Sequence, residues 1–218
     1  NITPIKQYRG ANTLPRELKL YTGTDGKLYV SNNVVPEVKA LRKNTLTLPA
    51  MNVKAVADKK NIIKSKENAF ELQMDVTPGK LATTGVELYN AKGEKVKIYF
   101  DTKERKLVMD RTESGLVEFG KRAVPHDIEK NYSDVHQGVG NTPFRVFNSI
   151  NYKNDFALGT WAPLSLCKGT TYHVDIFVDK CSVEIFVDGG RIAMTNLVFP
   201  TTPYTSIKFY NKGASSNF

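Results

Sequence analysis

The sequence predicts an all-β domain built as a sandwich or a barrel. Short strand-like runs recur along the 218 residues, and turn residues separate them about every eight to twelve positions. Apolar residues make up 40% of the chain and aromatic residues 10%, which suits a globular β domain with a substantial core. One weak helical stretch, residues 36–43, interrupts the pattern.

Three strand-and-turn units are predicted in the first half of the chain. Residues 18–21 and 27–30 flank a loop that ends in Asp-Gly, a pair typical of hairpin turns. A second hairpin joins 86–89 to 96–100, and a third unit begins with the strand 106–109. Consecutive strands joined by such short turns are expected to be antiparallel neighbours.

The last third carries the clearest β signal, a meander of three strands at 172–178, 183–187 and 191–199. Apolar residues alternate with other residues along it, so one face should be core, and His173 should lie on the surface. A closing strand is expected at 204–210. The core residues predicted from the alternation are Val174, Ile176, Val178, Val183, Ile185 and Val187.

The net charge of +9 does not by itself indicate a nucleic-acid partner. The densest basic clusters, at 54–64 and 92–97, have acidic neighbours and no interleaved aromatic residues, as is typical of a solvated face. No run approaches the roughly 20 apolar residues of a membrane helix. We therefore expect neither nucleic acid nor a membrane as a partner. Because the chain opens without an initiator Met, we expect it to be a piece of a longer protein.

The two cysteines, Cys167 and Cys181, lack the spacing of a disulfide scaffold or of a Cys-x-x-Cys pair. We predict that both are buried thiols. A disulfide between them is the alternative, because they flank the predicted strand 172–178.

Several classes of chemistry lack their motifs in this sequence. His126, His136 and His173 lie far apart without the spacing of metal ligands, so no metal site is expected. No Gly-x-Ser-x-Gly element is present, and Gly138-Val139-Gly140 has no strand and helix around it. We expect no serine nucleophile, no phosphate loop and no cofactor.

The segment 178–190, with Thr195 and 198–200, resembles the signature of the C-terminal sandwich of glycoside hydrolase family 32, which includes invertases, levanases and inulinases. Segments 12–18, 110–115 and 160–164 are similar to further elements of that family, in the same order. The resemblance implies an antiparallel two-sheet β-sandwich of the lectin/glucanase-like jelly-roll type.

The resemblance also implies a division of the chain. Residues 1–47 would be a remnant of the family's catalytic β-propeller with a linker, and 48–218 would be the sandwich. Typical members are far shorter at 121–160, so this stretch is interpreted as an insertion, and loops this long are often functional. Structural roles within the family motifs are expected for Arg16, Glu17, Asp110, Arg111, Ser182 and Glu184.

No catalytic residue is assigned. Retaining glycosidases need two carboxyl groups about 5 Å apart, which the family takes from an Asn-Asp-Pro-Asn and a Glu-Cys motif, with an Arg-Asp-Pro motif beside them. None of the three occurs here, and Asn154-Asp155 is followed by Phe156. Glu184 is interpreted as the partner of a Lys or Arg across the sheet. The chain alone should be inactive, whereas the resemblance implies a parent that hydrolyses fructans or sucrose and is secreted or periplasmic.

Three functions compete at this point. The chain supports the stability of the missing propeller, or it is a carbohydrate-binding, lectin-like module for fructan, or it is an oligomerisation module that contacts a second copy through the insertion. Trp161 and Tyr152 are the candidate sugar-binding residues, because sugar sites use aromatic faces. The competing interpretation is that the aromatic residues of 121–160 only form a small core of their own.

Overall fold

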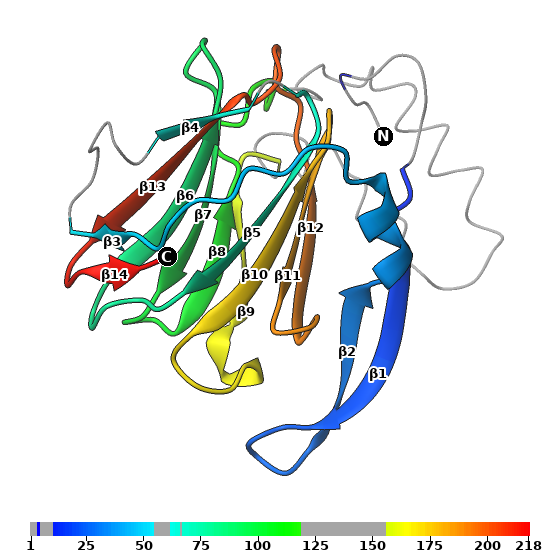
Figure 1. Cartoon of the computed structure of the whole chain (residues 1–218), viewed down its shortest axis with the longest axis vertical. Coiled ribbons are helices and arrows are strands. Elements are labelled where there is room, and N and C mark those ends of the chain that lie inside the picture. The colour runs from blue at the N-terminus through cyan, green and yellow to red at the C-terminus, as the bar shows by residue number, and fades with distance from the viewer. Residues whose placement is uncertain (1–3, 5–10, 55–61, 66, 119–155) are drawn as a thin grey trace, which may run out of the picture.

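The computed structural model describes residues 4, 11–54, 62–65, 67–118 and 156–218. Two antiparallel sheets pack face to face as a sandwich, and a separate hairpin stands beside one of them (Figure 1). The predicted fold class, an antiparallel two-sheet β-sandwich, is confirmed.

The smaller sheet has four strands. Its order is β12 (Ile192–Leu197), β11 (Ser182–Val187), β10 (Tyr172–Val178) and β5 (Phe70–Val76). β10, β11 and β12 are the predicted meander, and β5 adds to it from much earlier in the chain, pairing along the whole of β10.

The larger sheet has six strands and contains the second predicted hairpin, β6–β7. Its closing strand, β13, lies between β4 and β6 rather than at an edge. The order is β4 (Ile62–Lys64), β13 (Ser206–Lys212), β6 (Thr83–Tyr89), β7 (Lys95–Asp101), β8 (Lys106–Asp110) and β9 (Gly159–Pro163).

The first predicted hairpin forms a sheet of its own, in which β1 (Arg16–Thr22) pairs with β2 (Leu28–Val34). It lies on the side of the four-stranded sheet that faces away from the six-stranded sheet (Figure 1). The predicted helical stretch is a short 3-10 helix, η1 (Pro36–Leu41), which leads from β2 back to the sandwich. The remaining elements are the small pair β3 (Asn52–Val53) with β14 (Ser216–Asn217) and the 3-10 helix η5 (Leu164–Leu166).

The core fills the space between the two sheets, and the six residues predicted from the meander all belong to it. Val174, Ile176, Val183, Ile185 and Val187 are fully buried, and Val178 nearly so. Across from them, alternate residues of β6, β7 and β8 close the same core. His173 is exposed on the opposite face of β10, as its place in the alternation predicts.

Neither cysteine forms a disulfide, so that alternative is not realised. Cys167 is buried, and burial raises the pKa of its thiol above the usual range. Cys181 is only half-buried, which corrects the prediction that both thiols are buried. The reason is its position in the turn between β10 and β11, where only part of a side chain can reach the core.

Most of the predicted insertion, together with His126, His136, Tyr152 and the strand at 144–147, lies outside the described residues. The oligomerisation proposed for that stretch therefore stays a prediction. No helix among the residues described here is long and apolar enough to cross a membrane.

Candidate functional site

Glu184 of β11 and Arg16 of β1 form an ion pair that joins the hairpin to the sandwich. Arg16 Nη2 lies 2.6 Å from Glu184 Oε2, and the two side chains are 16% and 6% exposed. Charges removed from water to this degree are tolerated only when each has a partner. The pair is therefore a structural requirement of the seam between hairpin and sheet.

Other groups complete the environment of the Glu184 carboxylate. The backbone N–H of Leu14 donates to Oε1 at 2.9 Å, and the Thr195 hydroxyl donates to Oε2 at 3.1 Å. The Arg16 guanidinium also lies 5.0 Å from the ring centre of Phe186. Every oxygen of the carboxylate thus has a donor, and the cation rests on an aromatic face.

The hairpin explains an anomaly in the burial of β11. In a sandwich one face of a strand is normally exposed, yet Val183 to Val187 are all buried. Glu184 and Phe186 belong to the outer face and are only 5% and 1% exposed. They are covered because the hairpin lies over them, so this part of the outer sheet surface is an interface.

Two further contacts extend the seam along the hairpin. The Asn32 N–H of β2 donates to the carbonyl of Gly190 at 2.8 Å, in the turn between β11 and β12. Arg191 lies 4.2 Å from the ring centre of Tyr21, which stacks on Tyr29. The turn that follows β11 therefore holds the hairpin at a second point.

The segment after the hairpin is tied to the same sheet by Arg42. Its Nε and Nη2 each donate to one oxygen of Glu71 on β5, both at 2.6 Å. This bidentate geometry favours one orientation of the two planar groups. It brings η1 over the outer face of β5 and β10.

A groove of about 190 Å³ remains between η1 and that outer face. Residues of the hairpin and η1, such as Asn33, Pro36 and Val38, line one side, and Gln73, His173 and Phe177 belong to the sheet. The carboxylates of the groove are engaged, since Glu71 binds Arg42 and Asp175 accepts a hydrogen bond from Gln73. Both of these groove carboxylates therefore have hydrogen-bond donors within the protein.

His173 sits at the rim of this groove among acidic groups. Its Nδ1 lies 2.8 Å from Asp75 Oδ1, and its Nε2 lies 3.8 Å from Asp175 Oδ1. The hydrogen bond to Asp75 raises the pKa of His173 above its usual value, against the lowering effect of partial burial. The carboxylates of Asp175 and Asp188 act in the same direction as Asp75.

We expect His173 to stabilise the fold in its protonated form. Because the folded pKa is raised, this contribution is complete below the unfolded pKa of about 6.5 and is lost as pH rises through the folded value. The imidazole is half exposed, so the effect should stay below about 1 kcal/mol. The test compares the free energy of unfolding of the unsubstituted chain with that of His173→Gln at about pH 5.5 and at about pH 9. An equal pH dependence in the two proteins would contradict the prediction.

Asp110 and Arg111 lie away from the seam, where Asp110 ends β8 and Arg111 begins the loop that follows it. Asp110 accepts hydrogen bonds from the N–H and the hydroxyl of Thr112 at 2.9 and 2.7 Å. Arg111 donates to the carbonyls of Phe156 and Leu197 at 2.8 and 3.1 Å and lies 4.1 Å from the Phe156 ring centre. Through Arg111 the loop after β8 thus contacts β12 of the other sheet.

The other predicted site residues are not brought together. Glu17 is exposed and pairs with Lys19 of its own strand at 2.8 Å. Ser182 begins β11 and accepts, through its carbonyl, a hydrogen bond from the Asp179 N–H. Trp161 lies 58% exposed on β9, at the edge of the six-stranded sheet. Tyr152 lies outside the described residues.

One prediction about Glu184 was wrong. Its neighbours across the sheet are Phe177 and Thr195, so the cationic partner does not come from the sheet. It comes from Arg16, far away in the sequence, because the hairpin folds over β11. Sequence reasoning also missed Leu14, Phe186 and Gly190 as parts of the seam; the large apolar Phe186 at an outward position of the alternation was the available signal.

The geometry around Glu184 is that of an interface between the hairpin and the sandwich. Both carboxylate oxygens of Glu184 accept hydrogen bonds from residues of the seam. The described residues hold no cluster of three or more His, Cys, Asp or Glu that could bind a metal ion. These contacts of Glu184 attach the hairpin β1–β2 to the sandwich.

Comparison with protein families shows a match over residues 37–218 to the model described as "Glycosyl hydrolases family 32 C terminal". The chain belongs to this family. The matched region of this family 32 domain contains every strand of both sandwich sheets. The hairpin β1–β2 precedes the matched region.

Curated relatives of this family 32 domain are levanases. The chain is 24% identical to a levanase of Bacillus subtilis (strain 168) over 213 residues, which is 96% of the chain and 26% of that relative. It is 22% identical to a levanase of Bacillus sp. (strain L7), covering 96% of the chain and 19% of the relative. The chain therefore spans about a quarter or less of these proteins.

Solved structures agree with the fold. An exo-inulinase from Aspergillus awamori superimposes with a TM-score of 0.70 at 18% identity, covering 99% of this chain and 36% of that protein. A β-fructofuranosidase from Aspergillus kawachii superimposes with a TM-score of 0.63 at 14% identity, covering 94% and 36%. At these identities the likeness establishes the architecture of the domain.

Proposed function

We propose that this chain is the non-catalytic C-terminal sandwich of a larger fructan- or sucrose-hydrolysing enzyme and that it stabilises the catalytic propeller of that enzyme. Levanase relatives several times its length support this parentage. The lack of the Asn-Asp-Pro-Asn, Arg-Asp-Pro and Glu-Cys motifs supports a role outside catalysis.

The observation that carries the proposal is the exposed apolar face of the hairpin. Leu18, Leu20, Leu28 and Val30 are 66%, 72%, 71% and 55% exposed. They alternate along β1 and β2 and so share one face, where Leu20 pairs directly with Val30. A contiguous apolar surface of this kind marks an interaction site, and a two-stranded hairpin is marginally stable alone.

The two parts of the hairpin then have different tasks. The Arg16–Glu184 pair and the Asn32–Gly190 hydrogen bond attach it to the sandwich. Its leucine face is available to pack against a propeller, whose apolar surface it would bury. In this proposal the hairpin is the last part of the propeller, and the sandwich holds it in place.

Two observations test the parentage. The coding sequence upstream of Asn1 should contain the Asn-Asp-Pro-Asn, Arg-Asp-Pro and Glu-Cys motifs in one open reading frame. The chain itself should release no fructose from sucrose, levan or inulin. Upstream sequence without these motifs, or hydrolysis by the chain alone, would overturn the proposal.

The stabilising role is tested by Leu20→Lys in the longer protein, which also contains the proposed catalytic propeller upstream of Asn1. A buried lysine at this face should lower the temperature at which hydrolysis is lost, while KM for sucrose changes little, because the substrate site is remote. Leu116→Lys is the matched control, since Leu116 is also exposed, at 49%, but lies outside the hairpin. Equal thermal inactivation of the two variants would count against a docking role.

A further inference from the structure

A row of mainly aromatic positions crosses the outer face of the six-stranded sheet. Its members face one another in register on five neighbouring strands, β13, β6, β7, β8 and β9. Their neighbours along each strand point into the core, so these side chains point away from it. Four strand spacings of about 4.8 Å make the row about 19 Å long. In order, the row consists of Tyr210, Gly85, Tyr99, Val108 and Trp161.

Gly85 has a specific place in this row. A Cβ at this position would come within 2.0 Å of the Ile98 carbonyl oxygen and 2.7 Å of Tyr99 Cα, both backbone atoms. The sheet therefore requires glycine here, and no side chain stands between the two tyrosines. Burial raises the pKa of Tyr210, and the nearby phenol of Tyr99 adds to the effect, so the two rings lie close together at the buried Gly85.

Trp161 ends the row and is the most exposed of its members, at 58%. The Lys106 ammonium lies 4.6 Å from its ring centre, which orients the indole without burying it. Core packing does not explain an indole left in water, and large exposed aromatic side chains gather at binding surfaces. Tyr99 and Tyr210 are half-buried, so each exposes only part of its ring along the row.

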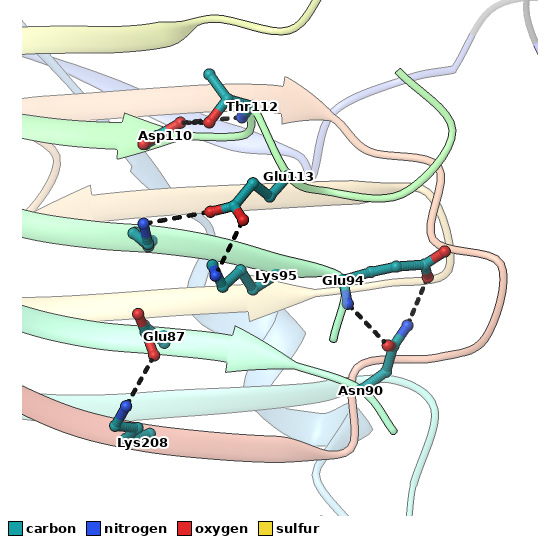
Figure 2. A network of polar contacts seen from close by, with 9 residues as sticks. Glu87, Asn90, Glu94, Lys95, Asp110, Thr112, Glu113 and Lys208 are labelled. Atoms are coloured by element: carbon teal, nitrogen blue, oxygen red, sulfur yellow. Dashed lines mark hydrogen bonds and ion pairs between the residues drawn. The ribbon is translucent and has the colours of Figure 1, made fainter. Parts of the chain in front are cut away.

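Charged side chains border the row, and their charges are balanced locally. On one side Lys208 pairs with Glu87 at 3.3 Å, and Lys95 and Lys97 pair with Glu113 at 3.1 and 3.4 Å. Figure 2 shows the Lys208–Glu87 and Lys95–Glu113 contacts on neighbouring strands, with Asp110 bound to Thr112 beside them. The border therefore offers donors and acceptors without a strong field of one sign.

The balance of charge decides the class of ligand. The carboxylates of Asp101 and Asp110 lie close enough to Tyr99 to raise the pKa of its phenol, after burial, so an anionic polymer would meet negative charge along the row. Nucleic acids need unpaired cations, whereas Lys208 and Lys97 beside the row have carboxylate partners, and the Lys106 ammonium is occupied by the Trp161 ring. Aromatic faces beside paired polar groups suit a neutral, hydroxyl-rich ligand.

We propose that this face binds a chain of neutral sugar residues along the row from Trp161 to Tyr210. It lies on the far side of the sandwich from the hairpin, so a sugar chain and a propeller could be bound at the same time (Figure 1). The argument for this binding surface does not depend on the proposed function. Only the choice of fructans as the first ligands to test rests on the proposed function.

Trp161 makes the proposal directly testable, because it is the only tryptophan in the chain. Its fluorescence should change saturably when levan or inulin is added. In native gels that contain the polysaccharide, Trp161→Ala should be retarded less, with an affinity at least about tenfold weaker. Trp161→Phe should keep part of the affinity, because it retains an aromatic face.

Leu41→Ala is the matched control, since it removes another exposed apolar side chain, 73% exposed, from η1, which lies over the outer face of the other sheet. This variant should bind levan or inulin as tightly as the unsubstituted chain does. Urea unfolding should show that all variants are folded. Binding of starch but not of fructans, if it depends on Trp161, would support the surface and count against the proposed function. Unchanged fluorescence with every neutral polysaccharide, or binding that survives Trp161→Ala, would overturn the proposal.

Discussion

Replacing Glu184 by alanine is expected to lower the free energy of unfolding by about 3 kcal/mol. The truncation leaves the Arg16 guanidinium in a seam where it is only 16% exposed, without its carboxylate 2.6 Å away. It also removes the acceptor of the Leu14 N–H. A buried charge without a partner costs more than the net contribution of the pair itself. Urea unfolding of the two proteins measures the difference.

Two further variants separate the buried charge from general effects. Glu184→Gln keeps an acceptor for Leu14 but removes the charge, so its loss should be intermediate. Glu17→Ala removes an exposed partner of Lys19 from the same strand as Arg16 and should cost less than about 1 kcal/mol. Equal destabilisation by Glu184→Ala and Glu17→Ala would contradict the prediction. It would mean that the Arg16 guanidinium reaches water and that the seam does not depend on the Arg16–Glu184 ion pair.

Replacing Gly190 by alanine should separate the hairpin from the sandwich, at a total cost of about 3 kcal/mol. Gly190 has φ +78, a conformation that costs other residues roughly 1 to 2 kcal/mol. The added Cβ would also lie 2.4 Å from the Asn32 carbonyl carbon and 2.5 Å from the Asn33 nitrogen. These are backbone atoms of β2, so relief requires the hairpin to move, and amide hydrogen exchange of β1 and β2 should rise.

The adjacent Gly189 provides the matched control. It has φ +66, but a Cβ there would meet nothing within 4 Å. Gly189→Ala should therefore show only the conformational cost of about 1 to 2 kcal/mol and leave exchange of the hairpin amides unchanged. Equal losses for the two alanine variants would mean that the contact between Gly190 and β2 does not hold the hairpin.

Local pattern was enough to predict the strands and their core faces. The alternation at 172–187 identified six core residues of β10 and β11, because side chains on a strand alternate with a period of two. Short turns likewise identified the hairpins β1–β2 and β6–β7, since strands joined by few residues pair with each other. Both inferences depend only on neighbours in the sequence.

The arrangement of the sheets was beyond such reasoning. β5 pairs with β10 about a hundred residues later, and β13 enters between β4 and β6. Such partners are selected by how two whole apolar faces fit together, and no local signal carries that choice. The aromatic row is of the same kind, because Tyr210, Tyr99 and Trp161 become neighbours only through the order and register of five strands.

The sequence by itself determined that this protein is an all-β sandwich of family 32 type. Only the tertiary structure decided what Glu184 does. Its place on β11 indicated an outward carboxylate, whereas the hairpin covers it and supplies Arg16 as its partner. The physical reason is that the burial of an outward side chain depends on which distant segment packs over the sheet, and that packing is settled only when the whole chain has folded.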